Sequence, residues 1–217
     1  MQLHYRRRSI VCRARSWGRV MSRGSLPRWL WSAAALFLAA PLSASAGGPS
    51  PTVAAFLLAD VYVAWKAAHS PAPLDKDTPF IALSAGDFDI GVRQDPTNVY
   101  GVEYRFGSRP FWNAQPIAGA AVTPHSSAYA YGGLRFALPV TQNIEVSTDF
   151  ALAAYSRGNG KDLGSAAEIY FALGASYRFS NNVRLEISGR HVSHGHFVST
   201  YDPGVNMLAI GLAFPLK

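Results

Sequence analysis

Cysteine is almost absent from this sequence. The 217 residues include a single one, Cys12, so the rest of the chain can form neither a disulfide nor a thiol-based site. Acidic residues are missing from the first 46 positions. Eight of the 20 basic residues lie there, which leaves 12 basic against 13 acidic residues in the remainder. The net charge of +7 therefore belongs to the N-terminal segment, and the remainder lacks the basic surface that nucleic-acid binding requires.

Long apolar runs are also missing. A transmembrane helix needs about 20 apolar residues, whereas the run Trp29–Leu42 has 14. This run follows the arginines and precedes the small residues Ala44 and Ala46, an order typical of a secretory signal peptide. We therefore predict a signal peptide over residues 1–46 and export of the protein.

The start of the protein and the segment after the leader are less sharply defined. Either Met1 or Met21 can begin a signal peptide of ordinary composition. Residues 47–79 are predicted to form an N-terminal lead-in and a proline-rich linker. The apolar run Val53–Trp65 is interrupted by an aspartate, and its pattern leaves it unassigned.

The pattern changes at Phe80. From there on, segments of about 9 to 13 residues alternate large apolar residues with small or polar ones, and turn signals separate the segments. The eight predicted strands span about residues 80–90, 98–107, 115–123, 127–138, 143–155, 165–179, 182–194 and 205–216. Such lengths suit strands tilted across a bilayer, and an even number lets the sheet close without free edges. Residues 80–217 are therefore predicted to be an all-β domain, an eight-stranded antiparallel transmembrane β-barrel in the outer membrane of a Gram-negative cell.

The two faces of each segment differ in chemistry. In the sixth segment one face holds Ile169, Phe171 and Leu173, and the other begins with Glu168 and ends with Arg178. A membrane barrel turns the apolar face to lipid, whereas a soluble sandwich buries it. Alternation does not separate the two, but the export signal, the missing cysteines and the inward charges favour the barrel. The charged residues predicted to pair in the lumen are Glu168, Arg178, Arg184, Glu186 and Arg190.

The connections between segments have two lengths. Residues 139–143 and 180–182 are tight turns, whereas 156–164 and 194–204 are longer. Outer-membrane barrels have short periplasmic turns and longer outer loops. The longer connections are thus predicted to face outward.

His191 and Ser193 break the apolar pattern of the seventh segment. Their parity matches Leu185 and Ile187, so both continue the lipid-facing row at its outer end. Asn206 begins the apolar row of the eighth segment, and hairpin pairing brings it beside this pair. Residues at i and i+2 lie about 6.5 to 7 Å apart at Cα, a gap that an imidazole can span to a serine oxygen. Polar groups on a lipid-facing wall are costly unless they bond each other or a substrate.

These residues resemble those of a family, the outer-membrane lipid A 3-O-deacylases of the PagL type (acyloxyacyl hydrolases). The resemblance covers about residues 80–217. It is strongest in YSRGNGKDLGSAAEIYF and in GRHVSHGH followed by DPGVNMLAIGLAFPL. It implies a barrel esterase that removes an ester-linked acyl chain, at the 3-O position, from lipid A of lipopolysaccharide. By the same resemblance Ser193 is the nucleophile, His191 is the base and Asn206 is the third catalytic residue.

Two positions depart from the family's pattern. The family places Glu where this chain has Asn206, and an amide can orient an imidazole but cannot stabilise an imidazolium by charge. Slower chemistry is therefore expected. The family also tends to have Asn directly after the serine, contributing to the oxyanion hole, whereas this chain has His194.

Other interpretations of the same residues are weaker. His191, His194 and His196 could bind a metal, but strand geometry points the last two away from the first. No cofactor or metal is predicted. The predicted partners are lipopolysaccharide and outer-membrane lipids, and the sequence leaves a homodimer open. The rival functions are a non-enzymatic barrel with a structural or lipid-binding role and an acyl transferase, for which the sequence shows no acceptor site.

Overall fold

The computed structural model describes residues 51–216 except 72, 74–76 and 92–93. The predicted signal peptide, both predicted start sites and Cys12 lie outside the described residues. One helix and eight strands form the described part. Their bounds are α2 Pro51–Ala68, β1 Phe80–Phe88, β2 Thr97–Arg105, β3 Gln115–Val122, β4 Ala128–Pro139, β5 Ile144–Ser156, β6 Ala167–Arg178, β7 Arg184–Ser193 and β8 Val205–Pro215.

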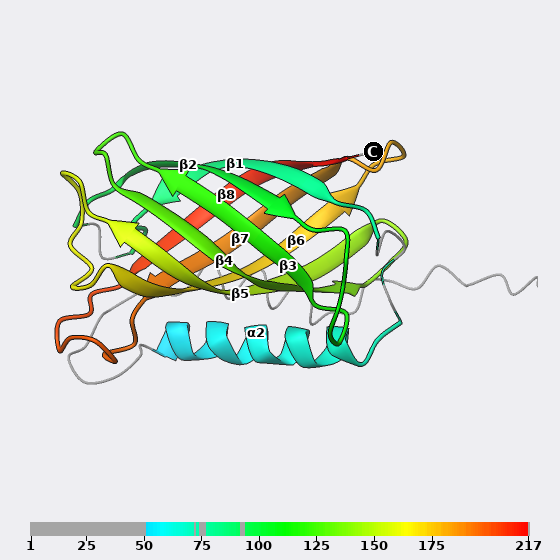
Figure 1. Ribbon diagram of the computed structural model, residues 1–217, viewed down its shortest axis with the longest axis horizontal. Coiled ribbons are helices and arrows are strands. Elements are labelled where there is room, and N and C mark those ends of the chain that lie inside the picture. Colours follow the sequence, from blue (N-terminus) through cyan, green and yellow to red (C-terminus); the bar gives the residue numbers. More distant parts are fainter. Residues whose placement is uncertain (1–50, 72, 74–76, 92–93, 217) are drawn as a thin grey trace, which may run out of the picture. The chain divides into compact units, whose positions relative to one another are not determined.

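The eight strands close into a barrel. Each strand pairs antiparallel with the next, and β8 pairs with β1, so the sheet has no free edge. Figure 1 shows the tilted strands and the two longest loops, after β5 and after β7, at the same end. The predicted eight-stranded antiparallel barrel is confirmed. We call the end with these two loops the outer end, and the end where β1 begins and β8 finishes the inner end.

The apolar side of each strand faces away from the barrel. On β2, Tyr100 and Val102 are 50% and 43% exposed, whereas Glu103 and Arg105 on the opposite face are buried. A soluble protein would bury the first pair and expose the second. The reversed pattern is that of a wall in contact with lipid around a polar interior.

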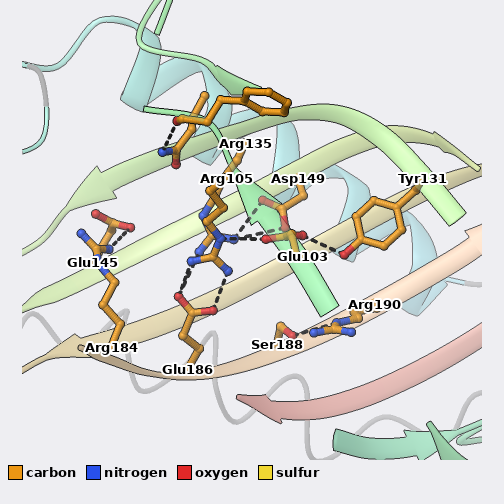
Figure 2. Close-up of polar contacts among 12 residues, drawn as sticks. Glu103, Arg105, Tyr131, Arg135, Glu145, Asp149, Arg184, Glu186, Ser188 and Arg190 are labelled. Atoms are coloured by element: carbon orange, nitrogen blue, oxygen red, sulfur yellow. Dashed lines mark hydrogen bonds and ion pairs between the residues drawn. The ribbon is translucent and has the colours of Figure 1, made fainter. Parts of the chain in front are cut away.

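Ion pairs and hydrogen bonds fill the interior at mid-height, as Figure 2 shows. Arg105 donates to Glu103 at 2.7 Å and to both carboxylate oxygens of Glu186 at 2.6 and 2.7 Å. Arg135 donates to Asp149 at 3.1 Å. Buried charges are tolerable only when they are paired in this way. The cavity beside them measures about 20 Å³, enough for roughly one water molecule, so the lumen at this height is packed rather than open.

Two further groups of side chains complete the lumen. Arg184 donates to Glu145 at 2.6 Å near the inner end. Towards the outer end, the rings of Tyr131 and Tyr170 stack with centroids 4.3 Å apart. The predicted inward direction of Arg184, Glu186 and Arg190 is confirmed, since all three belong to this interior or line its cavity.

The prediction that Glu168 and Arg178 join the ion pairs of the lumen is wrong. Arg178 lies at the inner end of β6 and donates to the backbone oxygen of Gln142 in the β4–β5 turn. Glu168 is buried at the opposite end of β6, and neither of its carboxylate oxygens has a hydrogen-bond partner. Alternation gives the face of a residue but not its height, and ten residues of strand separate these two by roughly 33 Å.

The outer loops are tied to one another. Lys161, in the β5–β6 loop, pairs with Asp89 in the β1–β2 loop at 2.6 Å, and both side chains are buried. Asp95, farther along that same loop, contacts His125 of the β3–β4 loop at 2.6 Å. These contacts hold the outer end as a unit, and the site described below lies at this end.

Helix α2 packs against β4, β5 and β6. Its side chains Asp60, Val63 and Ala67 are buried in the contact. The segment that the sequence left unassigned is thus a regular helix. Among the residues that the structure describes, no helix has both the length and the hydropathy needed to span a bilayer.

Candidate active site

The site lies on the outside of the barrel, where β7 approaches the outer end. Leu185 and Ile187 begin the outward row of this strand and are 40% and 54% exposed. His191 and Ser193 continue the row and are half-buried. Strand alternation therefore places an imidazole and a hydroxyl on the lipid-facing wall, as their parity predicts.

Asn206 lies directly across the hairpin from His191. The two residues are register partners in the β7–β8 pair. Nδ1 of His191 donates to Oδ1 of Asn206 at 2.7 Å, and the Ser193 hydroxyl donates to Nε2 of His191 at 2.9 Å. The structure thus brings the three predicted residues into one hydrogen-bonded chain. The Asn206 carbonyl fixes the tautomer that leaves the Nε2 lone pair facing the serine.

Both partners of the imidazole are neutral. The third residue is an amide, so it orients His191 without adding a negative charge that would stabilise an imidazolium. The Asn206 backbone oxygen also accepts a hydrogen bond from the amide of Ile90 at 2.9 Å. This bond fixes the start of β8 to the β1–β2 loop and supports the position of the amide side chain.

Gly204 packs directly against the hydrogen-bonded pair. Its φ is +53°, in the region that favours glycine. A Cβ added there would stand 3.2 Å from both His191 Cε1 and Ser193 Cβ. Sequence reasoning missed this contact, and the signal that could have found it is the Asp-Pro-Gly turn just before β8.

His194 is turned away from the serine. Its side chain is buried, and its Nε2 donates to the backbone oxygen of Tyr201 at 3.1 Å. Its Nδ1 lies 3.8 Å from a carboxylate oxygen of Asp202, which in turn accepts a hydrogen bond from the backbone amide of His196. His194 therefore links the β7–β8 loop to the end of β7. Its Nε2 already donates to the Tyr201 backbone oxygen, so this N–H is not directed at Ser193.

The alternative that His191, His194 and His196 bind a metal is not supported by their positions. His194 is buried, whereas His196 is exposed and lies beyond it in the loop. Within the described part of the chain, no three His, Cys, Asp or Glu residues are arranged to hold a metal ion. The chemistry open to the site is that of a hydroxyl activated by an oriented imidazole.

Comparison with known proteins bears on this arrangement. The profile of the family "Lipid A 3-O-deacylase (PagL)" matches residues 98–215, more than half of the chain. The chain belongs to the PagL family. This confirms the resemblance noted in the sequence, and the matched region contains His191, Ser193 and Asn206. No curated protein matches the chain.

Solved structures of similar fold are distant in sequence. The crystal structure of the outer membrane enzyme PagL has 14% identity and a TM-score of 0.49, with 63% of this chain and 99% of that one covered. A de novo designed transmembrane β-barrel has 14% identity and a TM-score of 0.48, with 64% and 96% covered. The N-terminal barrel domain of Pseudomonas aeruginosa OprF has 14% identity and a TM-score of 0.43, with 64% and 98% covered.

Proposed function

We propose that this protein is an outer-membrane esterase that removes the 3-O-linked acyl chain from lipid A of lipopolysaccharide. Two observations support the proposal. The chain belongs to the PagL family of lipid A deacylases. Its outer wall also carries a serine hydroxyl 2.9 Å from an imidazole that a third side chain orients at 2.7 Å. The second observation carries the mechanism.

The proposed reaction has two steps. Ser193 Oγ attacks the ester carbonyl while Nε2 of His191 accepts the hydroxyl proton. The bond between the acyl carbon and the sugar oxygen breaks, and Nε2 returns the proton to that oxygen, which leaves an acyl-serine. Nε2 then accepts a proton from water as the water attacks the acyl-serine. The bond between the acyl carbon and Ser193 Oγ breaks, and Nε2 returns the proton to Oγ, so that a free fatty acid and the original serine result.

A substrate already in the membrane suits a site on the barrel wall. The outward row below the site is apolar, and Ile187 and Ile210 are more than half exposed. A shallow groove of about 460 Å³ between β7, β8 and β1 continues this surface, and Ile210 lines it. Ile210 lies about 13 Å along β8 from Asn206. We propose that the acyl chain lies along this row while the ester reaches Ser193.

The test is the lipid A of cells that express the protein. Mass spectrometry should find one acyl chain fewer per lipid A molecule in cells with the wild-type protein, and fragmentation should assign the loss to the 3-O position. Cells that express Ser193→Ala at an equal level in the outer membrane should keep intact lipid A. Unchanged lipid A with folded wild-type protein and accessible substrate would contradict the activity.

The same experiment separates the rival functions. A non-enzymatic barrel leaves lipid A intact in both strains. An acyl transferase removes the chain but delivers it to an acceptor, so the acyl group would appear on another lipid instead of as free fatty acid. Loss from a position other than 3-O would retain the esterase and overturn the proposed regiochemistry.

A further inference from the structure

Helix α2 is apolar on both of its long sides. One side packs on the barrel through Asp60, Val63 and Ala67, which recur at helical spacing. The other side is exposed, and its large residues are Leu58 (72%), Val61 (60%), Tyr62 (51%) and Trp65 (57%). A helix on the surface of a soluble protein would turn polar residues outward. The exposed apolar side of α2 is therefore expected to contact an apolar environment.

Thr148 fixes where α2 lies on the barrel. Its neighbours on the same face of β5, Val146 and Phe150, are outward residues, so its hydroxyl points away from the lumen. The hydroxyl donates to Oδ1 of Asp60 at 2.5 Å, and both residues are fully buried. A hydroxyl on a lipid-facing wall needs a partner, and Asp60 supplies one. The only charged side chain in Val53–Trp65 is therefore hidden against the barrel.

The height of α2 follows from two contacts. Thr148 stands four residues above the inner end of β5, which is about 13 Å of strand or roughly 10 Å of height at a tilt near 40°. Asn113, in the inner-end loop between β2 and β3, donates to the backbone oxygens of Ala67 and Ser70. The seven residues from Asp60 to Ala67 rise about 10 Å in a helix. The two lengths agree, so this half of α2 runs beside the membrane-spanning part of β5.

We propose that α2 lies within the hydrocarbon layer of the outer membrane as part of the barrel's lipid-facing wall, with Leu58, Val61, Tyr62 and Trp65 against lipid acyl chains. The exposed side continues the apolar outward surface of the neighbouring strands at the same height. It carries no charge before Lys66, which lies near the inner end where its stem can reach the headgroups. The barrel rather than the helix alone holds α2 there, because its one acidic side chain is bonded to Thr148.

The environment of the exposed side of α2 can be tested by site-specific spin labelling, because the sequence contains a single cysteine, Cys12. With Cys12 replaced by serine, single cysteines can be placed at Leu58 or Val61 and labelled with a nitroxide. The protein is purified from outer membranes and reconstituted in phospholipid vesicles. Electron paramagnetic resonance then compares collisions with oxygen, which partitions into lipid, and with a water-soluble nickel chelate.

Two positions calibrate the scale. Ile210→Cys reports the lipid-facing barrel wall, and Phe197→Cys reports the aqueous outer loop, since both residues are more than half exposed. The labels at Leu58 and Val61 should give the oxygen-to-nickel ratio of Ile210. A ratio equal to that of Phe197 would place α2 in water and overturn the proposal. Low collision rates with both reagents would also overturn it, because they would mean that a second protein chain covers this face.

A buried position on the same helix gives the matched control. A label at Val63, which packs against the barrel, should be immobile and protected from both reagents. If Val63 and Leu58 behaved alike, α2 would not be docked on the barrel, and the proposal would fail for that reason. The experiment reports nothing on lipid A cleavage, so its outcome is independent of the proposed esterase activity.

Discussion

Two hydrogen-bonded sets of polar side chains lie on the lipid-facing wall, and they differ in access. On β5, Thr148 bonds to Asp60 beneath α2, and both side chains are completely buried. On β7 and β8, the chain from Ser193 through His191 to Asn206 is only half-buried. Each set is held by hydrogen bonds among its own members, as polar groups on an apolar wall require, although Oδ2 of Asp60 is buried without a hydrogen-bond partner. Only the second set can meet a molecule that arrives through the membrane.

The difference agrees with a structural role for the Thr148–Asp60 pair and with the proposed catalytic role for His191 and Ser193. The Thr148–Asp60 pair joins two elements, and its value lies in the energy of burial and bonding. The His191–Ser193 pair joins residues of one strand whose positions the backbone already fixes, so its bond adds little to the fold. Mutation should therefore affect activity at one place and stability at the other.

The largest expected effect is on activity at β7. Ser193→Ala or His191→Ala should lower lipid A deacylation by about 10³-fold or more, because the nucleophile and the base act as one unit. Both variants should keep their barrel, because an unsatisfied hydrogen-bond partner costs about 1–3 kcal/mol and the pairing of the eight strands does not depend on these side chains. The rate is measured with purified protein in vesicles that contain lipid A. The matched control is Ser188→Ala, an inward serine of the same strand that is bonded to Arg190, and it should keep the wild-type rate.

Asn206 should show a smaller effect that depends on charge. Asn206→Ala should lower activity on the order of 10²-fold, the lower part of what general base catalysis contributes, because the base remains but loses its orientation. Asn206→Glu should raise activity above wild type by adding the charge that is common in the family. Both expectations are checked by measuring the deacylation rates of the wild type, Asn206→Ala and Asn206→Glu on the same vesicles. If the Ala variant were as inactive as Ser193→Ala, Asn206 would do more than orient the ring.

The sequence predicted one of the two polar places and missed the other, for a physical reason. Strand parity assigned His191, Ser193 and Asn206 to one face, and hairpin pairing placed them together, because both rules are local. The position of α2 on the barrel depends on the hydrogen bond from Thr148 to Asp60, and these residues are 88 positions apart in the sequence. A helix that is apolar all round gives no pattern to show which side packs. The wrong prediction that Glu168 and Arg178 join the luminal ion pairs has the same origin, since strand parity carries no information on height.

A substitution at Gly204 should affect both stability and activity. Gly204→Ala must place a Cβ 3.2 Å from His191 Cε1 and Ser193 Cβ at a φ of +53°. The strain should destabilise the protein by about 1 kcal/mol. Displacing the pair by a few tenths of an ångström should lower activity on the order of tenfold, less than the 10²-fold that a 1 Å displacement can cost. Steady-state rates and urea unfolding of the same preparation measure both, and an unchanged rate would show that the pair tolerates movement.

The smallest effect on activity is expected at β5, where the effect on stability should be clear. Thr148→Val removes the hydroxyl that donates to the Asp60 carboxylate while keeping the shape of the side chain, and an unsatisfied buried polar group costs about 1–3 kcal/mol. Deacylation should stay at the wild-type rate, because Thr148 lies two strands away from β7. Urea unfolding in vesicles, followed by tryptophan fluorescence, reports the loss. Replacing both partners, as in Thr148→Val with Asp60→Leu, should recover much of it, because no polar group is then left unpaired. Thr148→Val could instead lower activity as much as Asn206→Ala while the barrel stayed folded. The Thr148–Asp60 pair would then contribute to catalysis, and assigning stability to β5 and activity to β7 would be wrong.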